Sequence, residues 1–417
     1  MRVNTKFTWF AAFSLVLTTF AFGCGNDLLP LSPSVISTDN ANSANSEGGT
    51  VNPVSEVRKA VGDIIGANAS PLPCGPVPSV VKGTELNLIR GWWANIYPWE
   101  FNPKESPLYP IPELFTPNQR QTPGQIIYQN RLLDQYGSGL DVLEYNPNPV
   151  AADHNHWLNT YFTSGSRKFF LLYEHIYGTR FRPVNGGPKD MSDPYNRKVF
   201  LEDLDFMFKN VISCYQSGYV TVNGRAVIYM WSSGQMIGDF AGLLEEARSR
   251  YPVFFIGSNE DFDNLERIIA LDGLMEYSLA GFGGPAGNYA LMMKGYIGHA
   301  GAQREALNSI RRQIGKKVYL FATFQAAYDD TLVVPRRNNS PLYPRTRGEM
   351  EEHARLVRMG LTRWRIFDGG PFAVFSELPE GGAVLPTIPR PEPPDKYVGY
   401  GTGRMDVLRK CFGGGRC

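Results

Sequence analysis

Two glutamates near the end of the chain form the pair with the clearest chemistry. Glu377 and Glu380 stand three residues apart in the stretch 376–381, where a turn can direct both side chains into one cleft. Hydrolysis of a glycosidic bond uses such a pair, one group moving a proton to the leaving oxygen and the other assisting from the ring side. A like charge nearby and partial burial would raise the pKa of one of them. Glutamates near a turn are also common on solvated surfaces, so their place in the fold decides between these interpretations.

Four aromatic residues gather in a second segment with a chemical use. The segment 92–99 contains Trp92, Trp93, Tyr97 and Trp99. Rings in a cleft can stack on the C–H faces of sugars, which would complement the glutamate pair, but the same rings can equally fill a hydrophobic core. Aromatic residues make up 13% of the chain, which suits a protein that stacks on flat ligands without requiring one.

A His-Asn-His motif at residues 154–156 offers a third chemistry, because zinc-dependent barrel hydrolases often carry such a pair after a strand. The other three histidines, His175, His299 and His353, do not complete a ligand set. The chain also has no G-x-S-x-G motif and no phosphate-binding loop, which excludes serine hydrolysis and phosphoryl transfer. We therefore expect no metal ion and no other cofactor.

The elements that would position these residues follow from the hydrophobic pattern after residue 86. Short apolar runs rich in β-branched and aromatic residues alternate with longer amphipathic segments, which is the pattern of repeated βα units. The runs predict eight strands, at 86–93, 141–145, 168–174, 225–231, 252–258, 274–278, 317–323 and 372–376. Between them we expect helices, for example at 122–136, 198–215, 238–250, 261–271, 300–314 and 349–359.

Eight units of this kind favour an α/β fold of the (β/α)8 barrel type, because near-continuous apolar strands indicate a parallel sheet buried on both faces. An open, doubly wound sheet is the alternative. In a barrel the reactive groups follow the carboxyl ends of the strands. The residues at these ends are carboxylates, amides and rings: Glu144-Tyr145-Asn146, Glu174-His175, Glu276, Tyr277, Gln325, Tyr328-Asp329-Asp330, Glu377 and Glu380. This position favours a catalytic role for the last two.

The amino-terminal end has the pattern of an export signal. Basic residues precede an apolar run at 7–22 that is too short for a stop-transfer helix. The residues ahead of Cys24 resemble a bacterial lipobox, so we expect residues 1–24 to be a lipoprotein signal peptide and Cys24 to carry the lipid. An ordinary signal peptide with cleavage nearby is the alternative.

Composition sets the remaining boundaries. Residues 25–75 begin with a polar, Ser- and Asn-rich stretch that cannot bury enough apolar surface to fold, and we expect a flexible tether there. The barrel is expected at 76–390. Residues 391–417 then form a carboxyl-terminal extension, for which we expect a short helix and a disulfide.

Charge and cysteine content limit the partners and the compartment. Forty-one Lys and Arg residues against forty Asp and Glu residues give a net charge of +1, which provides no basic field for a nucleic acid. Without Cys24, four cysteines remain, an even number that suits disulfides in an oxidising compartment and allows three pairings. We favour the pairing that contains Cys411–Cys417. We expect a lipid anchor in the membrane and a place in the bacterial cell envelope, at the outer membrane, in the periplasm or on the cell surface.

The stretch Phe375–Pro386 resembles the Asn-Glu-Trp-x-Glu-Gly-Thr-x-Ile-Glu-Pro stretch of glycoside hydrolase family 99, the endo-α-1,2-mannosidase-like enzymes, and of their relatives from polysaccharide loci. The Tyr-Asp-Asp-Thr sequence at 328–331, with the Arg and Gly residues that follow it, resembles a second stretch of that family. Weaker similarities occur at 97–99, 174–180 and 272–277, in the same order along the chain. The resemblance implies a (β/α)8 barrel.

The resemblance also implies roles for the glutamates. In that family the first glutamate of the pair deprotonates the sugar 2-hydroxyl, which attacks C1 to give an epoxide-like intermediate, and the second serves as general acid and then as base. These roles fall on Glu377 and Glu380 respectively, with net retention of configuration, one of the substrate-assisted exceptions to the usual scheme. The sugar subsites would be lined by Tyr97, Trp99, Glu174, Tyr277, Tyr328 and Asp329.

Several positions depart from the family pattern. Ser376 stands where the family has Asn, Leu378 where it has Trp, and Leu385 where it has Glu. Because both carboxylates remain while subsite residues differ, we expect a retaining endo-α-glycosidase whose substrate is a poly- or oligosaccharide, with a mannan-like glycan as the first guess. The alternatives are a non-catalytic glycan-binding lipoprotein of the same fold and an accessory protein for surface polysaccharide assembly.

Overall fold

The structure is a computed structural model, and it describes most of the chain from Cys74 onward. The described residues are 74–97, 102–104, 106–146, 152–165, 167–175, 180–184, 187–258, 260, 264–284, 287–332, 341–376, 383–388 and 401–417, with the backbone alone for 109 and 152–157.

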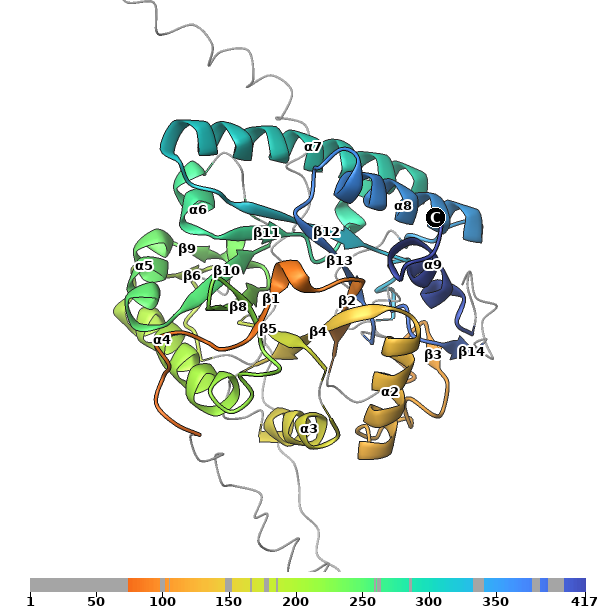
Figure 1. Cartoon of the computed structure of the whole chain (residues 1–417), viewed down its shortest axis with the longest axis horizontal. Helices are drawn as coiled ribbons and strands as arrows, with labels where there is room; N and C mark the ends of the chain where they lie inside the picture. Colours follow the sequence, from red (N-terminus) through yellow and green to blue (C-terminus); the bar gives the residue numbers. More distant parts are fainter. Residues whose placement is uncertain are drawn as a thin grey trace, which may run out of the picture.

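Eight parallel strands close into a barrel (Figure 1). Each strand pairs with the next one around the ring, and the eighth returns to pair with the first, Phe372 lying beside Trp93. The predicted (β/α)8 barrel is therefore confirmed, and the open sheet is wrong. The strands are β2 (Trp92–Ile96), β4 (Ser138–Tyr145), β5 (Phe169–Tyr173), β8 (Arg225–Met230), β10 (Val253–Gly257), β11 (Gly273–Met275), β12 (Tyr319–Phe324) and β13 (Gly369–Val374).

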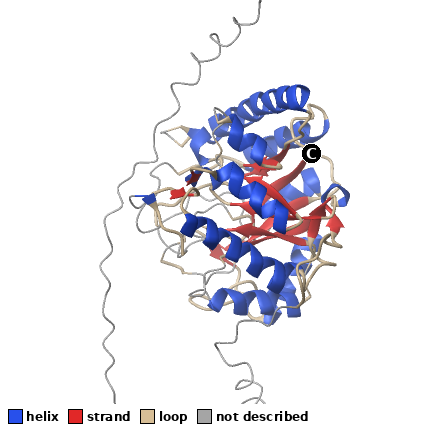
Figure 2. Cartoon of the chain, turned by 90° about the vertical axis from the view of Figure 1, so that its left-hand side faces the viewer, coloured by secondary structure: helices blue, strands red, loops and turns tan. Residues whose placement is uncertain are grey.

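A helix follows every barrel strand, and the helices cover the outside of the sheet (Figure 2). They are α2 (Pro123–Gln135), α3 (Ala152–Thr163), α4 (Pro194–Met207), α5 (Phe240–Arg250), α6 (Leu265–Ala270), α7 (Tyr289–Ile314), α8 (Arg347–Thr362) and α9 (Gly403–Phe412). The eighth helix, α9, comes from the region expected as a carboxyl-terminal extension. In the described part of the chain, none of these helices has the length and apolar character needed to cross a membrane.

Short elements extend the barrel and its loops. On the outer side, β7 (Val220–Val222) pairs antiparallel with β8, and β1 (Thr84–Glu85) pairs parallel with β7. Two small sheets lie in loops after the barrel strands, one from β3 (Tyr109–Pro110) and β14 (Thr387–Ile388), the other from β6 (Lys189–Asp190) and β9 (Met236–Ile237). The remaining helical turns are η1 (Leu86–Leu88), the π-helix η4 (Phe208–Ile212), η5 (Ser233–Gln235) and η6 (Ala280–Gly283).

The first strand differs most from its prediction. Residues 86–93 were expected to be extended, but Leu86–Leu88 form a 3₁₀ turn, and β2 begins only at Trp92. Gly91 explains the break: its φ is 90°, and a Cβ there would lie 2.1 Å from the carbonyl oxygen of Gly137. Only glycine fits so close a backbone approach at positive φ, so the chain turns there before the strand begins.

Aromatic rings fill the interior of the barrel. Trp93 lies 5.9 Å from Phe170 and 5.3 Å from Phe321, measured between ring centroids, and Tyr229 lies 5.8 Å from Phe372. On the other face of β2, Trp92 is fully buried and donates its indole N–H to the carbonyl oxygen of Tyr136. The interpretation of Trp92 and Trp93 as sugar platforms is therefore wrong, because both lie inside the core.

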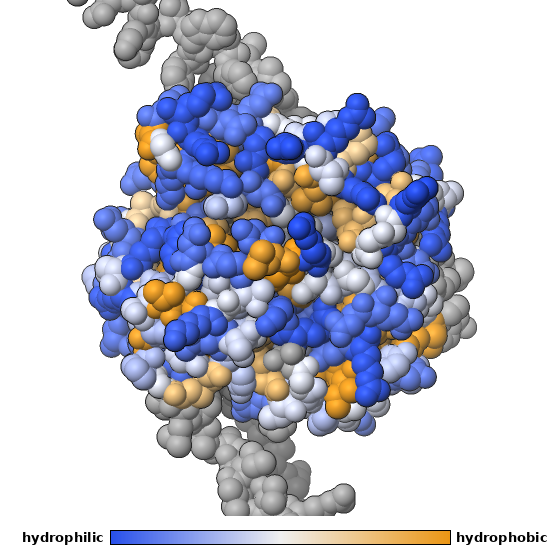
Figure 3. Space-filling view, in the orientation of Figure 1, coloured by the Kyte–Doolittle hydropathy of each residue, from blue (hydrophilic) through white to orange (hydrophobic). Residues whose placement is uncertain are grey.

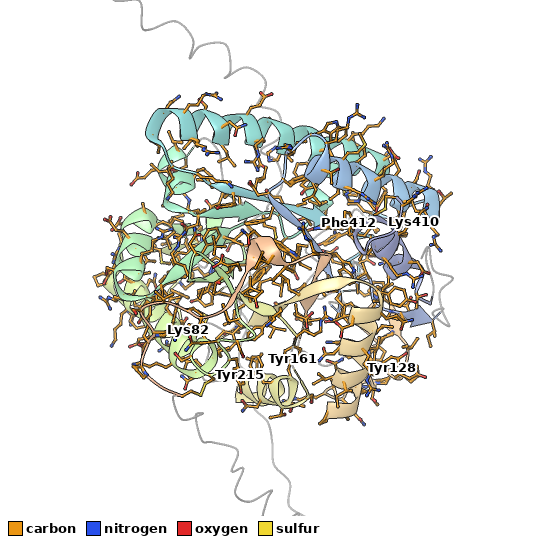
Figure 4. The ribbon with its side chains drawn as sticks, viewed as in Figure 1. Lys82, Tyr128, Tyr161, Tyr215, Lys410 and Phe412 are labelled. Carbon is orange, nitrogen blue, oxygen red and sulfur yellow. A yellow bond between two sulfur atoms is a disulfide. The ribbon has the colours of Figure 1, made fainter. Side chains whose placement is uncertain are left out.

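Two disulfides join parts of the outer layer to each other, and buried polar contacts join that layer to the barrel. Of the three pairings, the structure has Cys74–Cys214 together with the predicted Cys411–Cys417. Tyr161 of α3, labelled in Figure 4, donates its hydroxyl to the buried Asp141 of β4.

The amino-terminal ends of the strands are covered by η1, which lies across the ring in Figure 1. Beneath it is a cavity of about 430 Å³ whose lining includes Trp93, Phe321 and Arg90. The face seen in Figure 3, in the same orientation, carries mainly hydrophilic residues with separate hydrophobic patches. This face is the amino-terminal end of the barrel, whereas the reactive groups of such barrels lie at the opposite, carboxyl-terminal end.

Candidate active site at the carboxyl ends of the barrel strands

Two carboxylates are buried where neighbouring strands end. Glu144, the penultimate residue of β4, is 6% exposed, and Glu174, just after β5, is 3% exposed. The backbone N–H of Glu174 donates to the carbonyl oxygen of Tyr145 at 2.9 Å, which holds the two strand ends side by side. Carboxylates are rarely buried outside ion pairs and functional sites. Their burial at this end agrees with a polar mouth, as the sequence predicts.

Ser376 holds the end of the eighth strand against the end of the first. Its hydroxyl accepts a hydrogen bond from the backbone N–H of Tyr97 at 2.7 Å and donates to the carbonyl oxygen of Tyr97 at 3.3 Å. Next to it, the N–H of Phe375 donates to the carbonyl oxygen of Asn95 at 3.0 Å. Because Ser376 immediately precedes Glu377, these bonds fix the position of the chain directly before the predicted catalytic pair.

Residues 383–385 are also held by hydrogen bonds to the end of the eighth strand and to α9. The N–H of Val384 donates to the carbonyl oxygen of Val374 at 3.0 Å, and that of Leu385 to Phe375 at 3.2 Å. Arg404 of α9 is fully buried and donates to the carbonyl oxygen of Ala383 at 2.7 Å. The eighth helix therefore contributes directly to holding the segment that follows the predicted catalytic residues.

An aromatic pair lies between the ends of β8 and β11. Tyr277 is 6% exposed, and its ring centroid lies 5.9 Å from that of the half-buried Trp231, with the planes at 69°. Tyr277 also contacts the ring of Phe372 at 5.6 Å, which supports it from the core. The predicted site residue Tyr277 thus has a neighbour, Trp231, that the sequence analysis assigned to a strand. Its place directly after β8 is the signal that could have identified it.

The ends of β8 and β10 are held in an unusual backbone conformation. Ser232 has a φ of 48°, which a residue with a side chain rarely adopts. Its N–H donates to the hydroxyl of Ser258 at 2.7 Å, and the hydroxyl of Ser233 donates to the carbonyl oxygen of Ser258 at 3.1 Å. Backbone strain of this kind is concentrated at functional sites, where the surrounding contacts maintain it.

Tyr328 and Asp329 stabilise the loop after β12. The hydroxyl of Tyr328 donates to Asp330 at 3.1 Å, and Asp329 accepts from the hydroxyl of Tyr343 at 2.6 Å and from the N–H of Thr331 at 3.0 Å. Asp329 is 9% exposed, so its visible role is to shape this loop.

His175 follows Glu174 and is fully buried. Burial lowers its pKa to about 3, with a smaller contribution from the positive charge of Lys189. The imidazole is therefore neutral at ordinary pH. Hydrogen bonds with the backbone of Trp231 and Ser232 partly oppose the lowering of this pKa, and the ring lies beside those of Tyr173 and Phe181.

The remaining predicted site residues lie outside the described residues. These are both candidate catalytic residues, one aromatic subsite residue and the lipidation site: Glu377, Glu380, Trp99 and Cys24. The segment 154–156 lies on α3, without described side chains. Among the described side chains, no group of three or more His, Cys, Asp or Glu residues could hold a metal ion.

Two cavities lined by described residues lie away from this mouth. One of about 670 Å³ lies between α4 and α5, where Arg197 and Arg250 both form ion pairs with Glu246. The other is the cavity beneath η1. Since the reactive groups of such barrels lie at the carboxyl ends of the strands, neither cavity is the candidate active site.

Comparisons with known proteins agree with this architecture. No protein-family profile and no curated protein matches the sequence. Among solved structures, the GH99 endo-α-mannosidase from Bacteroides thetaiotaomicron in complex with bis-tris-propane matches with a TM-score of 0.52 and 14% identity, over 72% of this chain and 88% of the other. A second structure of that enzyme gives a TM-score of 0.52 and 12% identity, over 76% and 95%. A glycoside hydrolase-like protein gives a TM-score of 0.57 and 12% identity, over 82% and 97%. The chain therefore has the (β/α)8 fold of these glycoside hydrolases, as its motifs imply.

Proposed function

We propose that the protein is a retaining endo-α-glycosidase that hydrolyses a polysaccharide, with a mannan-like glycan as the first candidate. The observation that carries the proposal is the arrangement around Ser376. The residue directly before Glu377 is hydrogen-bonded to Tyr97 at the carboxyl end of the barrel, beside a mouth in which Glu144 and Glu174 are buried. A barrel with the fold of a GH99 endo-α-mannosidase supports the same reaction class.

In the proposed reaction, Glu377 takes the proton of the 2-hydroxyl while that oxygen attacks C1 of the same sugar. The bond from C1 to the leaving sugar breaks, and Glu380 donates a proton to the leaving oxygen, giving a 1,2-anhydro sugar. Water then attacks C1 and loses a proton to Glu380, while O2 leaves C1 and regains its proton from Glu377. Two inversions at C1 give net retention.

The rest of the mouth would bind the sugars. Stacking and hydrogen bonding to the glycan are proposed for Tyr97, Trp99, Glu174, Tyr277, Tyr328 and Asp329, and the structure adds Trp231 to the aromatic side of this set. The planes of the Trp231 and Tyr277 rings lie at 69° to each other. A sugar could therefore stack on one ring while its side contacts the other.

We further propose that the enzyme works at the bacterial envelope. The sequence pattern before Cys24 supports lipidation there, and the polar stretch that follows it supports a tether. The Cys74–Cys214 disulfide is consistent with an oxidising compartment.

The test is mass spectrometry of products from α-mannans, α-glucans and bacterial surface polysaccharides treated with protein beginning at about residue 53. Glu377→Gln and Glu380→Gln should each lower the rate of product release by about 100-fold or more, because each removes a proton-transfer group. Glu352→Gln, at an exposed ion pair on α8, is the matched control and should retain full activity. Turnover that survives both active-site substitutions would refute the assignment.

A second candidate is a non-catalytic glycan-binding protein, or one that assists polysaccharide assembly. The observation that favours it is the use of the Ser376 hydroxyl, which is occupied with the backbone of Tyr97 at a position where the family carries an amide. Binding of a glycan with no oligosaccharide released from any polymer would establish this candidate over the hydrolase.

A further inference from the structure

A buried lysine lies at the mouth of the barrel, in the loops that follow two neighbouring strands. Lys189 belongs to β6, which pairs with β9, and these strands lie in the loops that follow β5 and β8. A backbone bridge to Pro183 holds it from the other side. The residue is only 6% exposed, so its aliphatic stem is packed into the protein at the same end of the barrel as Glu174.

The two arginines described in the loop after β5 have different surroundings. Arg180 forms an ion pair with Asp203 at 2.8 Å, and the guanidinium of Arg182 lies 3.8 Å above the centroid of the Tyr195 ring. Within the described residues, Lys189 forms neither a hydrogen bond nor an ion pair within 4.0 Å through its ammonium group. Burial of a lysine disfavours the charged form of its ammonium group unless an anion compensates the charge.

Two site residues lie within electrostatic range of Lys189. Burial lowers the pKa of Lys189, while the carboxylate of Glu174 opposes that shift, and the lysine charge in turn helps to lower the pKa of His175. The three side chains therefore form one polar group at the mouth, which we call the Lys189 group: Lys189, Glu174 and His175. Within this group the imidazole is buried and neutral, so the charge available to attract an anion is that of the ammonium.

We propose that Lys189 is a specificity residue that binds an anionic substituent of the glycan, a carboxylate or a phosphate on a sugar near the scissile bond. The inference rests on the proposed function in placing a glycan at this mouth, and it names the class of substrate as an acidic polysaccharide. A bound anion would form a direct ion pair with the ammonium group. Glu174 acts on Lys189 only through its charge at longer range.

Direct binding tests the proposal without any turnover. The ligands are paired: a glucuronate-bearing mannan before and after reduction of its carboxylates to hydroxymethyl groups, and a phosphomannan before and after removal of its phosphate. Free glucuronate and glucose at millimolar concentration form a third pair that does not depend on the polymer. Affinity is measured by calorimetry for the wild type, Lys189→Met, Lys189→Arg and the control Lys168→Met, whose ammonium donates to Ser217 beside the start of β5.

The wild type and Lys168→Met should bind the acidic member of a pair more tightly. Lys189→Met should weaken that binding by about 10- to 100-fold, the usual effect of losing a charged hydrogen bond, and leave the neutral member unchanged. Lys189→Arg keeps the charge and should retain most of the preference, which separates charge recognition from a packing defect. The carboxylate and phosphate pairs show which anion is preferred.

Equal binding of acidic and neutral members by the wild type would overturn the proposal. So would an equal loss of both in Lys189→Met, or the failure of every acidic ligand to bind. Hydrolysis is scored separately: a preference for acidic glycans without cleavage would leave Lys189 as proposed and refute the hydrolase. Cleavage of acidic and neutral glycans at the same rate, in the wild type and in Lys189→Met alike, would support the hydrolase and refute the role of Lys189.

Discussion

Replacing Ser376 by alanine tests whether the predicted catalytic pair depends on the bond to Tyr97. Ser376 is 2% exposed, and its hydroxyl makes two contacts, a short one at 2.7 Å with the Tyr97 N–H and a longer one at 3.3 Å with its carbonyl oxygen. Leaving a buried N–H without an acceptor costs about 1–3 kcal/mol. Since Tyr97 is only half-buried and water can reach part of it, we expect a loss of about 1.5 kcal/mol in the free energy of unfolding.

That loss has a measurable size. An unfolding entropy of about 2.1 cal/mol/K per residue, over about 340 residues from Cys74 onward, gives about 0.7 kcal/mol/K, so Ser376→Ala should lower the Tm by about 2 °C. Activity should fall much further, because a displacement of about 1 Å in a reacting group can cost about 100-fold. We therefore expect kcat to fall by about 10- to 100-fold with a smaller change in KM.

The assay combines thermal unfolding with initial rates on the glycan that yields products in the polysaccharide survey. Ser249→Ala removes an exposed hydroxyl that donates to the carbonyl oxygen of Glu246 within α5, and it should change neither quantity. A fall in Tm with kcat at the wild-type level would refute the reasoning, because the bond would then support β2 without positioning the catalytic pair.

Two further predictions concern stability. Replacing Cys74 and Cys214 by serine opens a loop of 140 residues and should lower the free energy of unfolding by up to about 5 kcal/mol. Opening the carboxyl-terminal disulfide, which spans 6 residues, should lower it by about 2 kcal/mol. Urea unfolding of both variants checks this order. The pKa of His353 is lowered to about 4 by burial, so between about pH 6.5 and 4 the unfolded chain takes up a proton that the folded protein does not, and stability falls as the pH falls. His353→Gln should lower stability at every pH through lost packing against Phe324, but it should flatten the acid limb of the stability curve and leave the slope above pH 7 unchanged. An acid limb as steep as that of the wild type would contradict the prediction.

The barrel could be predicted because its strands carry their own signal. Each of the eight apolar runs overlaps a strand that is buried on both faces, and the amphipathic segments between them overlap helices on the outside. The bounds were less certain for the same reason: a strand buried on both sides shows no alternation of polar and apolar residues to fix its register. The pattern at 86–93 therefore predicts one strand although the chain turns at Gly91, and it leaves open whether Trp92 and Trp93 line the mouth or fill the core.

The candidate site could be predicted where a residue directly follows a strand. Glu174 and Tyr277 lie at the mouth for that reason alone. Arg404 and Lys189 could not be identified in this way, because their roles depend on contacts with segments distant in the sequence. Asp329 also follows a strand, but its carboxylate accepts a hydrogen bond from the hydroxyl of Tyr343 in its own loop. Its position after a strand therefore did not suffice to predict its contacts.

The disulfide at Cys74 also determines how the protein responds to a pull. Cys214 follows α4 and precedes residues that bond the start of β5, where the N–H of Phe169 donates to the carbonyl oxygen of Gly218 at 3.0 Å. A force along the chain ahead of Cys74 therefore passes through a covalent bond into the barrel wall and does not peel β1, a strand of two residues, away from β7. The load enters at the amino-terminal ends of the strands, so a protein held by that end turns its candidate site away from the attachment point.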